Sequence, residues 1–441
     1  MSRSRPWSDA NPDLRHQTQL PTVPIEQIEQ RLYELLSPGS FKPLRYVLGK
    51  EHQRLRERIL TLPVMMAVVL SLVYRRIPSL SELLRVLRLE GLLWVEPTSV
   101  SKQALCKRLM KLPARLFADI FESVMEQMHS SASPQSIPHS WLGVHHSFQT
   151  IWIADGSTLE ELRKKLKALS ESGTVLGGKM MMIVEAFSHN PVATWYNEDA
   201  KVNDKIFTEK ILEKLPKNGL LIFDLGFFKF PWFDEFTDNQ KFFVSRLREK
   251  TSYSVIRCLS SGAFYRDEII QMGQYRSNPC KHPVRLVSVL WGKHRYYYIT
   301  NVVDPTLLSS QQICELYRIR WRIEDAFSLT KRLLGLAYLW VGDTNGIQIQ
   351  IFATWIFYAV LNQLRTEVAV ALSQPIERIS YEMVFRGLYH FSRALLRGEH
   401  NDVVSYLVAH HQLLGLVKAT RKRHRDTIHQ SELIWIQPCL S

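Results

Sequence analysis

The chain has 441 residues, of which 46% are hydrophobic and 22% charged, so it can bury the core of two or three domains. Lysine and arginine outnumber the acidic residues by 56 to 42, which gives a formal net charge of +14. This charge predicts a polyanionic partner, and nucleic acid fits better than a membrane surface because the basic residues are spread along the whole chain. The five cysteines form no Cys-x-x-Cys pair, so neither a zinc site nor a disulfide framework is predicted.

The N-terminal segment is predicted to be helical. Residues 1–20 are polar and lack the apolar stretch of a secretory signal, and no later apolar run is long and unbroken enough to span a bilayer. From Ile25 to Met128, apolar residues recur at the three- and four-residue spacing of amphipathic helices. We therefore expect a helical N-terminal DNA-binding domain over residues 1–130, in a cytoplasmic protein that acts at the nucleoid and has no membrane partner.

Within this segment, the run from Ser99 to Leu109 is typical of the second helix of a helix-turn-helix. Lys102, Lys107 and Arg108 are then expected to face the DNA groove or its phosphates. Helix pairs of this composition also serve as plain scaffolding, so DNA contact is one of two interpretations.

A Ser-, Pro- and His-rich stretch over residues 131–147 is expected to link the helices to a second domain over residues 148–372. In that domain, two short apolar runs with the character of buried strands each end at an aspartate followed closely by glycine. The first run ends at Asp155 and the second at Asp224. Either aspartate by itself is equally explained as a turn former that closes a strand.

The elements around these aspartates predict an α/β domain. A helix is expected over residues 158–169, two antiparallel strands over 179–187 and 192–196, and a helix over 203–215. Residues 249–309 change to a pattern of short strands, which predicts a β-rich insertion before the next helix begins at residue 310 or 311.

That next helix carries four polar residues at fixed spacing. Tyr317, Arg320, Glu324 and Lys331 fall within a roughly 60° wide stripe if the segment is one helix with about 100° per residue. A hydroxyl, a guanidinium, a carboxylate and an ammonium on one face suit a phosphate held beside a metal. The alternative is the solvated face of a charged helix.

The spacing of Tyr, two residues, Arg, three residues, Glu, six residues and Lys resembles the YREK signature of DDE-type transposases encoded by bacterial insertion sequences. The resemblance implies a ribonuclease H-like core in which Asp155, Asp224 and Glu324 are the catalytic carboxylates and the ligands of two Mg²⁺ or Mn²⁺ ions. Tyr317, Arg320 and Lys331 are then implied to contact phosphate oxygens near the cut DNA end.

The resemblance also implies an aromatic residue in the insertion that stacks on a base flipped out of the duplex. Tyr296 is the first candidate and Trp291 the second. Packing of alternating strand aromatics inside the insertion is the explanation that ordinary strand statistics favour for both residues.

The remaining residues, 373–441, are predicted to be helical and contain a basic cluster over residues 418–425. This cluster is either a solvated surface or a contact to the DNA backbone. The resemblance implies a transposase that binds the terminal inverted repeats of its element as double-stranded DNA, cuts their 3′ ends and joins them to target DNA, acting as a homodimer. Two alternatives stay open: a ribonuclease H-like nuclease without strand transfer, and a catalytically silent DNA-binding protein.

Overall fold

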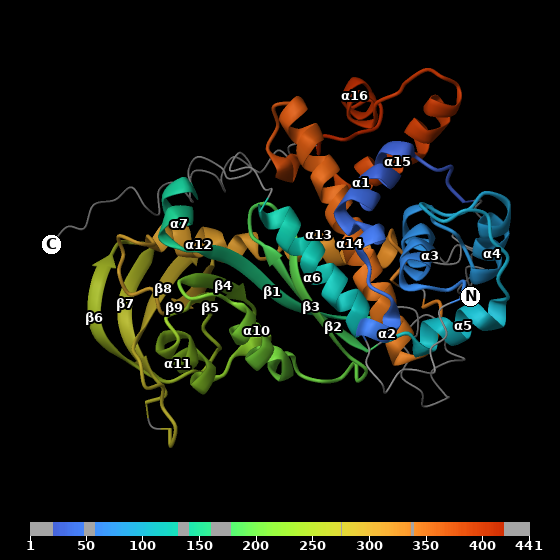
Figure 1. Cartoon of the computed structure of the whole chain (residues 1–441). Helices are drawn as coiled ribbons and strands as arrows, with labels where there is room; N and C mark the ends of the chain where they lie inside the picture. The colour runs from blue at the N-terminus through green and yellow to red at the C-terminus, as the bar shows by residue number, and fades with distance from the viewer. Residues whose placement is uncertain are drawn as a thin grey trace, which may run out of the picture.

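The computed structural model describes residues 21–47, 58–130, 141–159, 178–274, 276–336 and 339–418. The predictions for residues 1–20, for most of the helix over 158–169, for most of the linker over 131–147 and for the basic cluster beyond residue 418 lie outside this part of the chain. The described residues form three layers, in which a large mixed sheet lies between two groups of helices (Figure 1).

The sheet has nine strands in the order β3-β2-β1-β4-β5-β9-β8-β7-β6. The strands are β1 Thr150–Thr158, β2 Lys179–Glu185, β3 Pro191–Asn197, β4 Gly219–Phe223, β5 Phe242–Arg246, β6 Tyr253–Ser261, β7 Tyr265–Met272, β8 Val284–Trp291 and β9 His294–Thr300. Strands β1, β4 and β5 are parallel to one another, whereas all the other neighbouring pairs are antiparallel. The expected antiparallel pair is present as β2 and β3.

The register between β1 and β4 brings the two aspartates together. Ala154 pairs with Phe223 at the end of this parallel ladder. Asp155 and Asp224 are therefore the next residues on two neighbouring strands that run in the same direction. Because their strands are hydrogen-bonded side by side, the two carboxylates lie at the same edge of the ladder.

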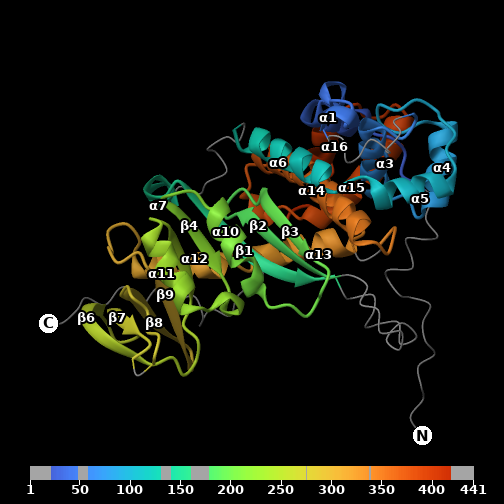
Figure 2. The same cartoon turned by 60° about the horizontal axis from the view of Figure 1, so that its bottom comes forward.

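Alternate side chains of the strands enter two different cores. Trp152 and Ala154 of β1 belong to a core with helices α10 and α11, whereas Ile151 and Ile153 belong to a larger core with the remaining helices. Figure 2 shows α10 and α11 apart from α6 and α14. The helices on the smaller-core side are η6 Asp204–Phe207, α10 Thr208–Lys214, η7 Leu225–Phe227 and α11 Phe230–Asp238.

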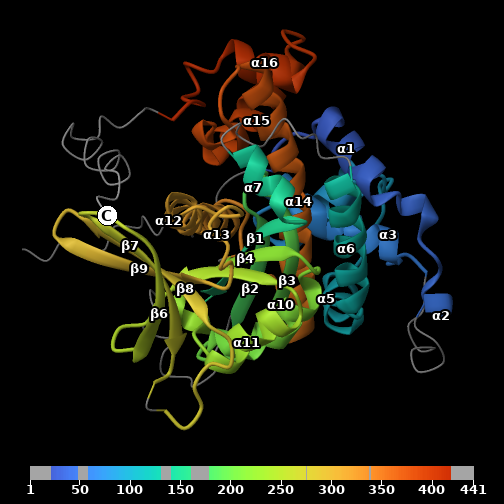
Figure 3. The same cartoon turned by 90° about the vertical axis from the view of Figure 1, so that its left-hand side faces the viewer.

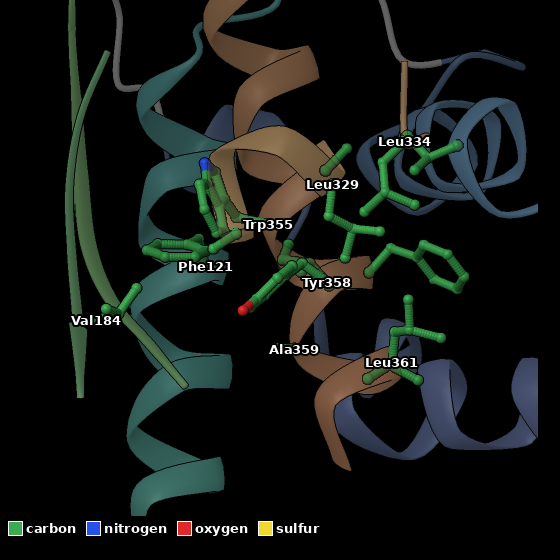
Figure 4. Close-up of a cluster of buried hydrophobic side chains, with 14 of the residues drawn as sticks. Phe121, Val184, Leu329, Leu334, Trp355, Tyr358, Ala359 and Leu361 are labelled. Atoms are coloured by element: carbon green, nitrogen blue, oxygen red, sulfur yellow. The ribbon is translucent and has the colours of Figure 1, made fainter. Parts of the chain in front are cut away.

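The larger core joins the helices that precede β1 to the long helix α14, Thr344–Ala371 (Figure 3). Trp355 and Tyr358 of α14 are fully buried, and Figure 4 shows them with Phe121 of α6 and Val184 of β2. The other elements of this layer are α1 Glu26–Leu36, η2 Pro38–Ser40, α2 Leu44–Val47, α3 Leu62–Tyr74, α4 Leu80–Leu89, α5 Lys102–Lys111, α6 Arg115–Ser130, α7 Leu142–Ser147, α12 Ser310–Ile319, α13 Arg322–Arg332, η8 Ile376–Arg378, α15 Tyr381–Leu396 and α16 Val403–Ala409.

Helix α14 is the one helix of the described residues that is long and apolar enough to cross a membrane. Its most apolar window is 83% buried inside the protein, however, as in the core helix of a globular fold. Burial among protein side chains accounts for its composition.

The strands of residues 249–309 extend the central sheet and do not form a separate one. Strand β9 pairs with β5, and β8, β7 and β6 follow outward from it (Figure 1). The expected strands near residues 284–291 and 295–303 are present as β8 and β9. Strand β6 is the edge strand, and Val255 and Ile256 on it are half exposed, so it lacks a buried alternating face.

Candidate active site

The expected strand end at Asp155 is wrong, because β1 continues to Thr158 in its pairing with β2, whereas β4 ends directly before Asp224. The two aspartates differ in their hydrogen-bond partners. The Asp155 carboxylate is largely buried and accepts hydrogen bonds from the Gly156 backbone N–H at 2.9 Å and from Arg320 Nη1 at 2.6 Å. The Asp224 carboxylate accepts a hydrogen bond from the Tyr317 hydroxyl at 2.8 Å. The two neighbouring strands are thus joined through their aspartates to the segment that contains Tyr317 and Arg320.

Burial raises the pKa of Asp155 to about 6, from an ordinary value of 3.8. The positive charge of Arg320 lowers this pKa, and the negative charges of Asp224 and Asp204 raise it further. A second positive charge, such as a bound cation, would therefore favour the ionised form of this carboxyl group.

The segment with the four spaced residues is not one continuous helix. Helix α12 begins at Ser310, as expected, with a capping box between Ser309 and Gln312, but it ends at Ile319. The backbone N–H groups of Arg320, Ile323 and Glu324 bond to carbonyls three residues back, and α13 begins at Arg322.

The expected single-helix stripe is therefore wrong. A tight turn separates Tyr317 and Arg320, at the end of α12, from Glu324, in the first turn of α13. Arg320 nevertheless lies close to the carboxylates of Asp155 and Glu324. Its Nη1 is 2.6 Å from Asp155 Oδ2, and its Nη2 is 3.8 Å from Glu324 Oε1.

A cavity of about 680 Å³ brings the candidate residues together. Its walls contain the three candidate carboxylates and a group of basic residues from α13 and the turn before it. The lining residues are Asp155, Gly156, Ser157, Asp224, Arg320, Glu324, Phe327, Ser328, Lys331 and Arg332. Acidic and basic side chains that are far apart in the sequence thus line one cavity.

Tyr317 lies beneath this cavity and is only 5% exposed. Burial and the neighbouring charge of Asp224 raise the pKa of its hydroxyl, so the group stays protonated and donates to Asp224. The contact of Tyr317 with DNA phosphate stays a prediction.

The residues of the cavity fit a divalent cation by their chemistry. Asp155, Asp224 and Glu324 supply hard oxygen donors of the kind that Mg²⁺ and Mn²⁺ prefer. Among the described residues, no three His, Cys, Asp or Glu side chains are gathered closely enough to form a complete cation-binding cluster. Arg320 pairs with Asp155 and places a positive charge beside the carboxylates.

The aromatic candidates lie in the outer part of the sheet. Tyr296 is on β9, where the guanidinium of Arg246 lies over its ring at 5.7 Å from the centroid, and Trp291 ends β8 opposite His294. Neither residue lines the cavity. A third aromatic that the sequence pattern did not single out, Trp321, is 60% exposed in the turn between α12 and α13.

The predicted DNA-binding face of α5 is partly wrong. Lys102 and Lys107 are exposed, but Arg108 is buried and donates from its Nε to the Leu60 carbonyl at 2.8 Å. Its guanidinium joins two segments of the helical layer, because position 108 falls on the same face as the buried Leu105 and Leu109. In addition, residues 90–101 separate α4 from α5, a much longer connection than the turn of about 3–4 residues in a helix-turn-helix.

Some cavity residues were missed by the sequence analysis. Ser157 follows Asp155 and Gly156 on β1, Ser328 lies one helical turn after Glu324, and Arg332 follows Lys331. Arg332 donates a hydrogen bond to Ser328. Helical spacing from Glu324 is the signal that would have found Ser328.

This geometry agrees with the comparison of the chain with a family model. Residues 147–359 match the model described as "Transposase DDE domain". This part of the chain is therefore similar to the DDE domain of transposases, which is an enzyme domain.

Individual relatives are similar to part of the chain. A protein of Sinorhizobium fredii named as transposase y4zB is 25% identical over 228 residues, which cover 49% of this chain and 61% of the relative. A protein of Geobacillus stearothermophilus named as a transposase for insertion sequence element IS5377 is 24% identical over 167 residues, covering 37% of this chain and 44% of the relative. The chain thus spans about half the length of these curated relatives.

A solved structure titled as a piggyBac transposase synaptic complex with hairpin DNA aligns with a TM-score of 0.38 and 11% identity. The alignment covers 91% of this chain and 87% of that chain.

The pKa of Asp155 predicts a pH dependence of stability in metal-free protein. Because the folded-state pKa is raised from 3.8 to about 6, the folded state binds this proton more tightly, and the ionised carboxyl destabilises the fold as pH rises through this window. Asp155→Asn should therefore gain stability relative to wild type by up to about 3 kcal/mol between pH 4 and pH 7, at about 1.4 kcal/mol per pKa unit.

Urea unfolding in EDTA at several pH values measures this difference. Asp199→Asn, in an exposed turn, is the matched control and should show no such trend. A difference between Asp155→Asn and wild type that stays constant from pH 4 to pH 7 would contradict the raised pKa.

Proposed function

We propose that this chain is a transposase of a bacterial insertion sequence, which binds the terminal inverted repeats of its element, cleaves the DNA ends and transfers the 3′ ends into target DNA. One observation carries the proposal: Asp155 and Asp224, on neighbouring parallel strands, share one cavity with Glu324, Arg320 and Lys331. The similarity to a protein named as a transposase and to two named as insertion-sequence transposases supports the same interpretation.

We further propose that the catalytic domain has a ribonuclease H-like core and belongs to the YREK branch of these enzymes. Its support is the strand order β3-β2-β1-β4-β5 with β1, β4 and β5 parallel, and the spacing of Tyr317, Arg320, Glu324 and Lys331. Strands β6 to β9 would then be the β-rich insertion of this branch.

The proposed chemistry uses two Mg²⁺ or Mn²⁺ ions, with Asp155, Asp224 and Glu324 as the residues that would hold them. When bound, such ions lower the pKa of a water nucleophile and neutralise charge on the attacking and leaving oxygens. The Tyr317 hydroxyl holds the Asp224 carboxylate in one orientation through its hydrogen bond.

The basic residues of the cavity would bind the phosphates of the DNA end. Arg320, Lys331 and Arg332 line the same cavity as the carboxylates. A guanidinium presents several N–H donors in a fork that matches phosphate oxygens, and an ammonium adds a point charge. Positive charge beside the carboxylates would also offset repulsion between them and the DNA backbone.

The proposed partners are double-stranded DNA, as inverted repeat and as target, and a second copy of the chain in the DNA-bound complex. The net charge of +14 supports a nucleic-acid partner, with Lys102 and Lys107 on the exposed face of α5 as further backbone contacts. We place this activity in the cytoplasm, at the nucleoid. Tyr296 and Trp291 remain the proposed residues for stacking on a flipped base.

Cleavage of a labelled duplex that carries the inverted repeat flanking the gene tests the proposal. With Mg²⁺ or Mn²⁺, the wild-type protein should nick the repeat end and Glu324→Ala should not, whereas both proteins should bind the duplex equally well in EDTA. Asp325→Ala is the matched control, because Asp325 is the adjacent acidic residue and its exposed side chain lies outside the cavity.

The alternatives predict other products in the same assay. Nicking without joining to a target duplex would favour the nuclease, and tight binding without nicking by the wild type would favour the silent DNA-binding protein. Retention of cleavage by Glu324→Ala would remove Glu324 from the catalytic residues.

A further inference from the structure

A fourth carboxylate, that of Asp204, lies against the residues that follow Asp155 and Asp224. Asp204 begins the short helix η6, and its side chain is 19% exposed but does not line the cavity. Its Oδ1 lies 2.7 Å from Nζ of Lys179, the first residue of β2. The same ammonium donates to the Val202 carbonyl at 2.9 Å, so this ion pair fixes the start of η6 against the sheet.

The Asp204 carboxylate occupies the space where two glycines would otherwise carry a side chain. A Cβ on Gly156 would lie 2.1 Å from Asp204 Oδ1, and a Cβ on Gly226 would lie 2.9 Å from Asp204 Oδ2. Real Cβ atoms essentially never approach another atom so closely, so a side chain at either position would have to displace the Asp204 carboxylate or the backbone beside it. One carboxylate therefore lies against both glycines in the place a side chain would take.

Glycine is needed at these two positions because it has no side chain, and not because of its backbone freedom. Neither Gly156 nor Gly226 has the positive φ that favours glycine over other residues. Gly156 directly follows Asp155, and Gly226 is two residues after Asp224. Contact with Asp204 thus explains the glycine that follows each of the two aspartates.

We infer that Asp204, held by Lys179, is a positioning residue that sets the distance between the Asp155 and Asp224 segments by lying against Gly156 and Gly226. This role rests on the proposed function, because it concerns the placement of the proposed catalytic carboxylates. Helix η6 also packs on η7, the short helix that follows Asp224, so the contact spans both segments. A shift of about 1 Å in a catalytic group is enough to lower a rate about a hundredfold.

A double-mutant cycle between Gly156→Ala and Asp204→Ala tests the inference. Gly156→Ala alone should lower the urea midpoint of unfolding and reduce the rate of DNA-end cleavage about a hundredfold. In the Asp204→Ala background, the same Gly156→Ala change should leave the urea midpoint nearly unchanged and alter the cleavage rate by no more than about twofold. The obstructing oxygens are then gone, and the remaining close atom, Lys179 Cε at 3.1 Å, belongs to a long side chain that can move. Gly226→Ala provides a second cycle with a milder clash, should Gly156→Ala fail to fold.

Further variants separate positioning from general stability. Asp204→Ala should slow cleavage while its affinity for the duplex, measured by fluorescence anisotropy in EDTA, stays at the wild-type value. Asp204→Asn keeps the shape and an acceptor for Lys179 and should recover most of the rate. Gly143→Ala is the control for the glycine change, since a Cβ there meets no atom within 4 Å.

Additive effects in the cycle, or a wild-type cleavage rate for Asp204→Ala, would overturn the inference. Coupling in the unfolding midpoint without coupling in the cleavage rate would also overturn it, because the contact would then be purely structural. A wild-type protein that does not cut refutes the proposed function instead, and the unfolding cycle still decides whether Asp204 excludes the two side chains.

Discussion

Replacing Asp224 with asparagine should lower the rate of DNA-end cleavage by at least about a thousandfold, equivalent to about 4 kcal/mol of transition-state stabilisation. Asparagine keeps an oxygen that can accept the Tyr317 hydrogen bond, so the fold around the site is retained. The substitution removes the negative charge, which the proposed cations require. Single-turnover cleavage with Mg²⁺ or Mn²⁺ measures the loss.

Two companion variants make this result specific. Asp238→Asn changes an exposed carboxylate that pairs with His282 at the end of α11, outside the cavity, and should cut at the wild-type rate. Tyr317→Phe removes only the hydroxyl that donates to Asp224 and should cause a smaller loss, about 10- to 150-fold, since one hydrogen bond to a charged group contributes about 1.5–3 kcal/mol. If Asp224→Asn cut as fast as Asp238→Asn, Asp224 would have no catalytic role.

Local sequence patterns were enough to find the two strand-end aspartates. A short apolar run that leads to an aspartate predicts both strands, and Asp224 directly follows β4 as expected, but β1 continues past Asp155 to Thr158. Their proximity depends on the pairing of β1 with β4, which are more than 60 residues apart in the chain. The resemblance to a known family supplied this pairing, since periodicity alone does not choose strand neighbours.

The break between α12 and α13 has no local signal. The segment contains neither proline nor glycine, so its composition is that of a continuous helix. The buried ion pair between Arg320 and Asp155 holds this turn at the sheet, while Trp321 beside it points its ring toward solvent. Both are tertiary features, which explains why spacing along the sequence predicted the right residues with the wrong helix geometry.

Long-range contacts also explain the other differences. The sequence predicts Arg108 to be an exposed basic residue, and only the packing of α5 against residue 60 shows that it is buried. Asp204 reads as an ordinary helix-start residue, and only the folded chain shows that it lies against Gly156 and Gly226. Strand β6 is an edge strand with exposed apolar residues, so it lacks the alternation by which a half-buried strand is found.

The outer strands and the helix that precedes the site are joined by a buried ion pair, which makes a strong prediction about stability. Arg285 of β8 is fully buried and donates from Nε and Nη2 to the carboxylate of Asp267 on β7, at 2.7 and 2.6 Å. Ser310, the first residue of α12, donates to the same carboxylate at 2.6 Å. Asp267 therefore connects the outer sheet to the helix that carries Tyr317.

Asp267→Ala should destabilise the fold by about 3–5 kcal/mol, because it leaves a buried guanidinium without its charged partner. Urea unfolding at pH 7 measures this loss. The exposed pair of Asp238 and His282 is the control, and Asp238→Ala should cost no more than about 1 kcal/mol. Replacing both Asp267 and Arg285 with leucine should be less damaging than Asp267→Ala, since no buried charge is then left unpaired.

The same variant also tests whether the outer strands support the site. Since the Ser310 hydroxyl loses its acceptor, the start of α12 should loosen, and DNA-end cleavage by Asp267→Ala should fall at temperatures where the protein is still folded. If Asp267→Ala were as stable as Asp238→Ala, the ion pair with the buried Arg285 guanidinium would not contribute to the stability of the fold, and the prediction would be wrong. A destabilised variant with wild-type cleavage would instead mean that the position of Arg320 depends on its ion pair with Asp155 and not on the anchoring of α12.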